Sequence, residues 1–304
     1  MTYSIVARDK ETGEFGVAVQ SHYFQVGPVV PWAEAGVGAV ATQAHVNVSF
    51  GPLGLDMLRA GYTAGQALGA LLAGDPAPES RQVAIVDATG AVAVHTGTKC
   101  IPAAGHVLGD SFSCQANLME KDTVWEAMAA AFAVTKAPLA ERMLAALRAA
   151  EGEGGDIRGK QSAAMLVVSG KPTGRSWDDR LFDLRVEDHP EPNEELGRLL
   201  GIKRAYMMDS AADRLEEAGD KPGAATKRAE AFNLAPDMTE LRFWTGLSLA
   251  EAGDLDGACV LMEPALTENP RWLETLNRLV AVDRLAPDLA RSIAARLTSR
   301  ASRI

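Results

Sequence analysis

Thr2 is the residue whose type and position most clearly suggest catalytic chemistry. A Met that precedes a small residue is normally removed, and Thr2 would then carry both the α-amine and a side-chain hydroxyl. An α-amine has a reference pKa of about 7.7–8.0, so it can act as the base that activates the neighbouring hydroxyl. A β-rich run begins at Thr2, and a strand would hold both groups at a sheet end. Many proteins start Met-Thr without such chemistry, so an ordinary first strand is the alternative.

Other reactive residues do not form a recognisable site in the sequence. The three cysteines lack CxxC spacing, and Cys114 lies inside an expected strand, which is typical of a buried core thiol. The five histidines include no metal-binding spacing, and although His22 and His45 could meet in space, we expect no metal site. Residues 36–41 match GxGxxA, but no strand directly precedes them and no helix follows. We therefore expect no cofactor.

Composition and charge narrow the classes of partner. The 304-residue chain has a formal net charge of −10, and acidic residues outnumber basic ones on both sides of residue 190. Neutralising many phosphates requires clustered Lys and Arg, so we expect no nucleic-acid partner. Asp9 and Glu11 stand where a signal peptide would be apolar, and no run of about 18 apolar residues occurs. We therefore expect a cytoplasmic protein with no membrane partner.

The first 190 residues predict a domain of mixed helices and strands. Strands are expected at 3–8, 14–21, 36–43, 81–87, 91–97, 106–115, 162–169 and 181–188. Helices are expected at 51–73, 122–134 and 138–151. This order fits two sheets with helices on both outer faces, and it does not fit a βαβ alternation. We therefore expect an α+β domain over residues 1–190, built as a four-layer αββα sandwich.

The remaining chain predicts a second, all-α helical-repeat domain over residues 195–304. Ala-Gly-Asp at 218–220 recurs at 252–254, and Pro236 recurs as Pro270, each 34 residues later. This period, with its turn and its proline, resembles the tetratricopeptide repeat. Because arrays of fewer than about three repeats are unstable alone, we expect this module to pack against the first domain or against a partner subunit. It offers either a packing and dimerisation surface or a site for a protein partner.

Six long stretches of the first domain resemble one family of bacterial proteins. They are TYSIVARD (2–9), GVAVQSHYFQVG (16–27), GVGAVATQ (36–43), RQVAIVD (81–87), GGDIRGKQSAAM (154–165) and DLRVEDHPEP (183–192). On these motifs the chain resembles the DUF1028 family, which is assigned to the N-terminal-nucleophile hydrolase superfamily. The resemblance implies an αββα fold and hydrolysis of an amide bond. It does not supply the substrate, because one fold can host many functions.

The resemblance also implies which residues would face the nucleophile. The end of strand 36–43 would place the backbone N–H groups of Gln43 and Ala44 opposite Thr2, where they could stabilise an oxyanion. Gln43 could instead be an ordinary cross-strand hydrogen bonder. Ser21 and Arg8 are further candidates for lining a substrate cleft. Arg8, Arg81 or Arg158 would suit a carboxylate on the substrate.

A glycine-rich loop at 154–162 resembles the loop that brings polar groups beside the terminal amine. Asp156 would hold the ammonium or Arg158, and Ser162 would hydrogen-bond the amine, with Asn117 approaching from another strand end. Each has a structural alternative: Asp156 and Arg158 could form a surface pair worth about 0–1 kcal/mol. Ser162 could cap a strand, and Asn117 could occupy a turn.

Two functions remain open from the sequence. The first is an amidohydrolase that uses Thr2 to cleave a small-molecule or peptide-like amide. The second is a non-catalytic binding protein, in which the sandwich keeps a cleft and the helical tail recruits a partner. The superfamily likeness also implies a homo-oligomer. Residues 28–43 lack the Lys or Arg that many superfamily members place near the nucleophile, and Arg158 or Lys160 could take that place.

Overall fold

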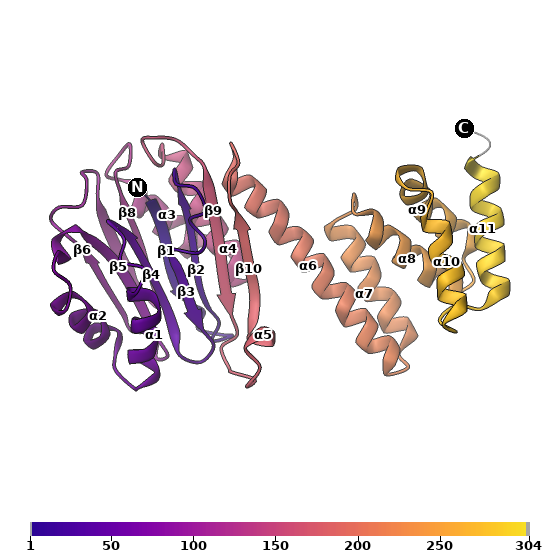
Figure 1. Ribbon diagram of the computed structural model, residues 1–304, viewed down its shortest axis with the longest axis horizontal. Coiled ribbons are helices and arrows are strands. Elements are labelled where there is room, and N and C mark those ends of the chain that lie inside the picture. The colour runs from indigo at the N-terminus through magenta and orange to yellow at the C-terminus, as the bar shows by residue number, and fades with distance from the viewer. Residues whose placement is uncertain (1, 302–304) are drawn as a thin grey trace. The chain divides into compact units, whose positions relative to one another are not determined.

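A computed structural model describes residues 2–301 and divides the chain into two compact units (Figure 1). The first unit ends at Leu200 and the second begins at Gly201. Helix α6, Pro192–Glu217, contributes residues to both units. The sequence predicts a boundary between residues 190 and 195, where this helix begins. The compact units separate about two turns further along the helix.

Two antiparallel sheets form the first unit. The larger sheet has the strand order β10-β9-β2-β1-β8-β7, and the smaller has the order β3-β4-β5-β6. The larger sheet comprises β1 Thr2–Arg8, β2 Phe15–Ser21, β7 Gly105–Gly109, β8 Phe112–Asn117, β9 Ser162–Val168 and β10 Arg180–Val186. The smaller sheet comprises β3 Pro31–Glu34, β4 Gly38–Ala44, β5 Arg81–Asp87 and β6 Val92–Thr96.

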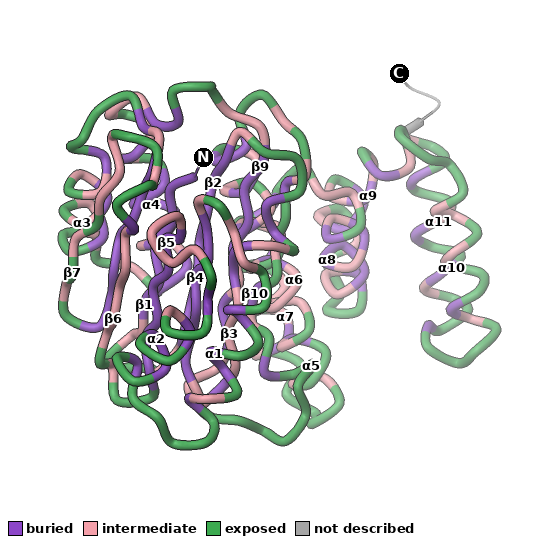
Figure 2. The backbone as a smooth tube through the Cα atoms, turned by 60° about the vertical axis from the view of Figure 1, so that its left-hand side comes forward, coloured by how far each residue is buried: buried purple, intermediate pink, exposed green. Residues whose placement is uncertain are grey.

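The sheets face each other, and helices cover their outer sides. Strand β1 contacts β4 across the layer between the sheets, and the central strands are buried (Figure 2). The smaller sheet is covered by α1 Phe50–Arg59 and α2 Ala64–Ala73, and the larger by α3 Val124–Val134 and α4 Leu139–Gly152. Two short helical turns are Pro78–Ser80 and α5 Ser176–Asp179. The expectation of a mixed α and β domain is confirmed.

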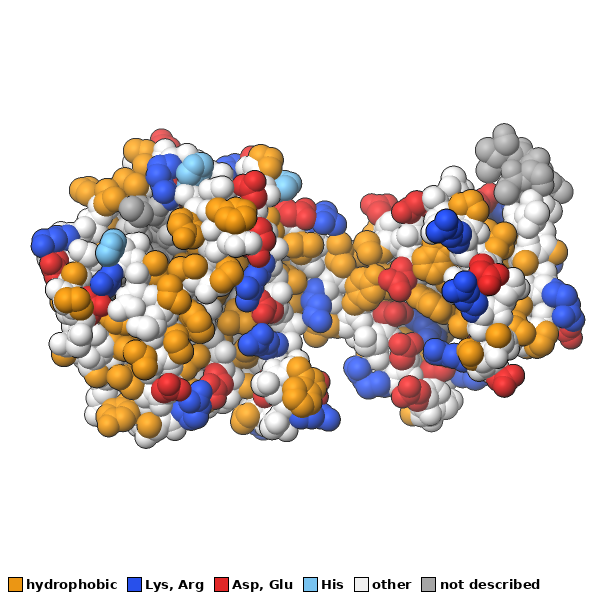
Figure 3. Space-filling model, in the orientation of Figure 1, with side chains coloured by type: hydrophobic (Ala, Val, Ile, Leu, Met, Phe, Trp, Pro, Cys, Tyr) orange, Lys and Arg blue, Asp and Glu red, His pale blue; other side chains and the backbone are white. Residues whose placement is uncertain are grey.

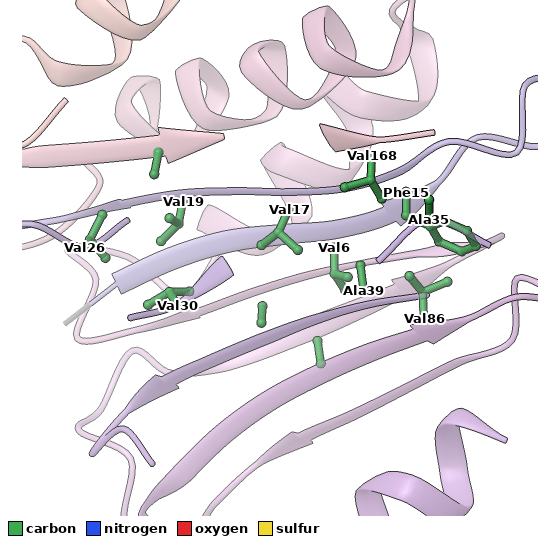
Figure 4. Packing of buried hydrophobic residues seen from close by; sticks show 13 residues of the cluster. Val6, Phe15, Val17, Val19, Val26, Val30, Ala35, Ala39, Val86 and Val168 are labelled. Carbon is green, nitrogen blue, oxygen red and sulfur yellow. The ribbon is translucent and has the colours of Figure 1, made fainter. Parts of the chain in front are cut away.

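An apolar core fills part of the layer between the sheets. Val17 and Val19 of β2 point toward the sheet that carries Ala39 of β4 (Figure 4). Alternate residues of a strand face opposite sides, so Val40 and Ile85 point outward and pack with the helices of the smaller sheet. This is why residues 39–41 of β4 and 83–86 of β5 are apolar on both faces, as expected of strands covered from both sides.

The structure differs from the predicted elements at three places. Residues 51–73 form two helices, because Gly61 adopts φ +92° and Thr63 caps the second helix in a capping box. Residues 106–115 fall in a hairpin, β7 and β8, whose turn holds Ser111 at φ +67°. Strand β3 is additional, and its four residues are too few to show a period of two.

The second unit is helical, and its sequence repeat recurs in the structure. Its helices after α6 are α7 Lys221–Leu234, α8 Thr239–Glu251, α9 Leu255–Glu268, α10 Trp272–Ala281 and α11 Pro287–Ala301. Helices α7 and α9 have the same length, and Asp220 and Asp254 cap them by accepting the N–H groups of Gly223 and Gly257. No helix among residues 2–301 is both long and apolar enough to cross a membrane.

The close approach of α1 to β3 generates a stability prediction. A Cβ added at Gly51 would overlap the indole ring of Trp32, which its Nε1–H holds in place on the Val29 carbonyl. We expect Gly51→Ala to lower the free energy of unfolding by about 1–3 kcal/mol in denaturant titrations. Gly69→Ala in α2 is the control, because nothing lies within 4 Å of its added Cβ. It should raise stability by about 0.5–1 kcal/mol, and an equal loss in both variants would contradict the packing argument.

Candidate functional site

Four polar residues form one row across the larger sheet, one on each of four neighbouring strands. In the strand registers, Thr2 lies opposite Asn117 of β8 and opposite Ser21 of β2, and Ser21 lies opposite Ser162 of β9. Directly opposed residues project from the same face of an antiparallel sheet. All four are therefore on the face that meets the smaller sheet, and all four are at least nine-tenths buried. The fold brings together residues that are up to 160 positions apart.

Thr2 is held at both its hydroxyl and its carbonyl. Its hydroxyl donates to the Ser21 hydroxyl at 3.1 Å. Its carbonyl oxygen accepts from the side-chain amides of Gln43, at 3.3 Å, and Asn117, at 3.4 Å. Thr2 is 7% exposed, so it lies close to the surface without projecting into solvent. The position of its hydroxyl is therefore set by groups from both sheets.

A buried amide network joins the two sheets beneath Thr2. The side chains of Gln43 and Asn117 each donate to Gln82 Oε1 at 2.8 Å. Gln82 in turn donates to the Ala116 carbonyl at 2.9 Å. All three amide side chains are almost completely buried. Polar groups removed from water are costly unless they are hydrogen-bonded, so this network demands one relative placement of the sheets.

A second chain of hydrogen bonds extends the network along β1 and β8. Gln115 donates to the Ser4 hydroxyl at 2.6 Å, and Ser4 donates to Gln43 Oε1 at 2.7 Å. Ser113 donates to Gln115 Oε1 at 2.9 Å. The layer between the sheets is therefore apolar around β2 and polar where β1 and β8 meet β4 and β5.

Asp156 lies at the same end of the larger sheet as Thr2. Its carboxylate accepts the backbone N–H of His22, which follows β2, at 3.2 Å, and pairs with Arg158 at 2.7 Å. Burial raises the pKa of the Asp156 carboxyl, against the opposing effect of the Arg158 and His22 N–H groups. Burial also lowers the pKa of Arg158. The Asp156 carboxylate is fully buried, so the pair is not an ordinary surface contact.

Ser162 belongs to the polar row, but its hydroxyl contacts the loop that follows β2. It donates to the Tyr23 carbonyl at 2.5 Å and accepts the Val26 N–H at 3.1 Å. The sequence predicts a hydrogen bond from Ser162 to the amine of a chain that begins at Thr2. In the structure these two contacts fix the loop that carries the exposed Tyr23 beside the row.

Ala44 ends β4 in a left-handed conformation, with φ +68°. This region costs an L-residue about 1–2 kcal/mol and is often occupied near functional sites. The Thr42 N–H donates to the Val30 carbonyl on the β3 side, at 3.2 Å. Backbone N–H groups alternate in direction along a strand, so the Gln43 N–H faces β5 and the Ala44 N–H faces the β3 side. Leu118, directly after Asn117, is also left-handed, with φ +56°.

Arg8 lies away from this row. It ends β1, six residues from Thr2, which is about 20 Å along an extended strand. Its guanidinium lies over the Phe15 ring, 5.8 Å from the centroid. The expectation that Arg8 lines the same cleft as Thr2 therefore does not fit the strand geometry, because the two residues occupy opposite ends of β1.

The remaining candidates from the sequence fall outside the site. Cys114 is fully buried within β8, and burial raises the pKa of its thiol. His45 lies 2.8 Å from Arg81 through Nδ1, and among the described residues no hydrogen bond joins its side chain to that of His22. Residues 2–301 contain no group of three or more His, Cys, Asp or Glu side chains able to hold a metal ion.

Several residues of the network were missed in the sequence. Ser4, Gln82 and Gln115 are not among the candidates that the sequence suggests, yet each is completely buried in the network. The available signal was alternation: Thr2 and Ser4 in β1, and Ser113, Gln115 and Asn117 in β8, are polar at every second position. Such a pattern inside strands that are covered on both sides predicts a buried polar face.

The network predicts opposite outcomes for two buried glutamines. Gln82→Leu should lower the free energy of unfolding by about 2–4 kcal/mol, because Gln43 and Asn117 would lose their shared acceptor. Gln20 is the matched control, since it is equally buried and its side chain has no hydrogen-bond partner among the described residues. Gln20→Leu should therefore be neutral or stabilising in the same denaturant titration. Equal destabilisation of both variants would contradict the role given to the network.

Comparisons with known proteins agree with this architecture. A family model described as "Family of unknown function (DUF1028)" matches residues 2–196. A similar solved structure is that of protein SPO2555 from Silicibacter pomeroyi, also described as DUF1028, with 32% identity and a TM-score of 0.59. The similarity covers 66% of this chain and 87% of that chain. No curated protein matches the chain. Because the family model covers well over half of its residues, this chain belongs to the DUF1028 family.

Proposed function

We propose that the first unit is an αββα sandwich of the N-terminal-nucleophile hydrolase type that cleaves a small or peptide-like amide, with Thr2 as nucleophile. The observation that carries the proposal is the polar row at the sheet end. The Thr2 hydroxyl contacts Ser21 in that row, and the buried Asp156 carboxylate is held at the adjoining strand end. The proposal requires that the mature chain begin at Thr2.

The reaction would proceed in two steps. Thr2 Oγ attacks the amide carbon and its proton passes to the α-amine; the C–N bond then breaks as that proton moves to the leaving amine. Water then adds to the ester carbon, the bond from that carbon to Thr2 Oγ breaks, and a proton returns to this oxygen. One amide and one water give one carboxylic acid and one amine, so the chemistry requires no oxidant and no cofactor.

The groups around Thr2 could hydrogen-bond its α-amine and set the pKa of that amine. Asn117 Oδ1 is buried without a hydrogen-bond partner among the described residues, so it can accept an N–H from the amine of the opposing residue. Asp156 supplies a negative charge that favours the ammonium form. Arg158 limits that effect through its ion pair with Asp156. Lys160, the other candidate cation, is paired with two glutamates.

The Ala44 N–H is the stronger candidate for stabilising the oxyanion. It faces the β3 side of the ladder, whereas the Gln43 N–H faces β5, as the alternation of donors requires. The left-handed backbone at Ala44 has a conformational cost that a catalytic role would explain. Gln43 would then contribute through its side chain, which holds the Thr2 carbonyl.

The second unit supports the alternative function, that of a non-catalytic binding protein. Its capped 34-residue repeat favours a tetratricopeptide-like module that recruits a protein partner. A non-catalytic binding protein could have both this module and the sandwich. Loss of hydrolysis on removal of the Thr2 hydroxyl separates the two functions.

Thr2 variants test the proposed nucleophile. Mass spectrometry of protein from its native host should show a chain that starts at Thr2. With an amide found by library screening, Thr2→Ala should lower kcat at least about 10³-fold, because the attacking oxygen is gone. Thr2→Ser keeps the oxygen and should retain measurable turnover. Both variants still present a small residue after Met1, so processing is matched. Unchanged hydrolysis by Thr2→Ala would favour the binding protein.

The pH profile tests the role of Asp156. Removing a nearby negative charge lowers the pKa of an ammonium group. Asp156→Asn should therefore move the acid limb of the kcat/KM profile to lower pH, by about 1 pH unit, while the maximal rate falls. Asp183→Asn is the control, since Asp183 pairs with exposed arginines on β10. An unshifted acid limb in Asp156→Asn would remove Asp156 from the proposed mechanism.

A further inference from the structure

The second unit contains a groove that the proposed hydrolase chemistry does not use. It encloses about 600 Å³ and lies among α6, α7, α8 and the end of α10. Figure 3 shows acidic and apolar side chains side by side on the visible face of this unit. A volume of this size accommodates several side chains of a ligand. We refer to this cavity as the acidic groove.

Negative charge dominates the walls of the acidic groove. Six carboxylates line it, against two guanidinium groups, those of Arg228 and Arg284. The carboxylates are Asp209, Asp213, Glu216, Glu217, Glu240 and Glu251. They are not arranged as a metal site, because the described residues contain no group of three or more acidic, His or Cys side chains able to hold an ion.

Arg228 neutralises only part of this charge. Its guanidinium donates to Asp213 at 2.8 Å and to Glu216 at 2.6 Å, and its Nε lies 3.9 Å from Asp209. Its side chain is only 11% exposed, so the guanidinium forms part of the groove wall and does not extend into solvent. Glu240 accepts a hydrogen bond from the uncharged Tyr206 hydroxyl at 2.6 Å. The groove therefore keeps an excess of negative charge after its internal pairs are counted.

The remaining charge is unfavourable in the free protein. Burial, and then the neighbouring Asp213, raise the pKa of the Asp209 carboxyl. Burial, and then Glu216, raise the pKa of the Glu251 carboxyl, against the opposing effects of Lys221 and Arg228. A cation placed among these carboxylates would favour their charged forms.

The lining of the groove also has an apolar part. Trp244, Leu247 and Leu279 contribute to it beside the carboxylates. An indole face attracts both apolar groups and cations. A ligand that matches this lining needs positive charges next to apolar groups, which a small hydrated cation does not provide.

We propose that the acidic groove binds a segment of a partner protein that carries lysine or arginine side chains beside apolar ones. Charge complementarity carries the proposal: the walls hold unneutralised carboxylates, and the Trp244 and leucine side chains accept apolar groups between them. The binding is independent of Thr2 and its chemistry. It is expected to weaken as salt is added, since part of the attraction is between exposed charges.

Fluorescence anisotropy with the full chain tests the groove. The probe is a short fluorescein-labelled peptide of alternating lysine and leucine, compared with the same peptide carrying glutamine in place of lysine. The triple variant Asp209→Asn, Glu240→Gln and Glu251→Gln should weaken binding of the lysine peptide at least about tenfold. It leaves Asp213 and Glu216 in place, so Arg228 keeps its two closest partners.

A matched triple variant controls for net charge. Glu230→Gln, Glu268→Gln and Glu274→Gln remove the same charge from the second unit outside the groove, and they should change affinity less than about twofold. Trp244→Phe should remove the tryptophan-emission change that accompanies binding. If the first triple variant fails to fold, Glu217→Lys on the exposed rim replaces it and should also weaken binding.

The proposal would be overturned if the lysine peptide did not bind, or if the glutamine peptide bound equally well. Equal loss of affinity in the two triple variants would also overturn it. Binding of spermine without binding of the peptide would overturn it as well and would instead make the groove a small-cation site.

Discussion

The amide group of Gln82 couples the two sheets of the first unit. Its oxygen accepts from Gln43 of the same sheet and from Asn117 of the opposite sheet, and both donors also reach the Thr2 carbonyl. A buried amide without hydrogen-bond partners destabilises the fold, because the free energy lost on removing it from water is not offset by packing. One relative placement of the sheets satisfies all of these groups, and that placement also sets where Thr2 lies.

The layer between the sheets has an apolar region and a polar region, which stabilise the fold in different ways. Valine and alanine side chains from β2, β4 and β5 form the apolar region, which supplies hydrophobic stabilisation without directional demands. Where β1 and β8 meet β4 and β5, the inward positions are amides and hydroxyls, whose hydrogen bonds are directional. Left-handed residues follow immediately at Ala44 and Leu118. Residues with an unfavourable left-handed backbone and buried polar side chains therefore lie together at the end of the sheet that carries Thr2.

In the second unit, local capping contacts rather than long-range hydrogen bonds define where the helices α7 and α9 begin. Its repeat places the same capping aspartate before α7 and α9, so local hydrogen bonds define where each helix begins. The surface of the acidic groove is not repeated in this way. Arg228 on α7 and the carboxylates of α6 and α8 become neighbours only when the helices pack. The structural repeat and the charged groove therefore arise from different residues of the same helices.

Local patterns in the sequence determined much of the first unit. Periods of two and of about 3.6 residues, with their turn residues, predicted most strands and helices, and the 34-residue recurrence predicted the helical tail. The type and position of Thr2 made it a candidate nucleophile, and motifs that resemble the DUF1028 family suggested Ser21, Asn117, Asp156 and Ser162 as residues near it.

Only the tertiary structure decided the rest, because alternation tells which face a residue occupies but not which strand lies opposite. The pairing of β1 with both β2 and β8 created the polar row, and it left Arg8 at the far end of the same strand. The packing of the sheets turned Gln82 from an ordinary strand residue into the shared acceptor of the network. Such contacts join residues distant in sequence, so no local pattern encodes them.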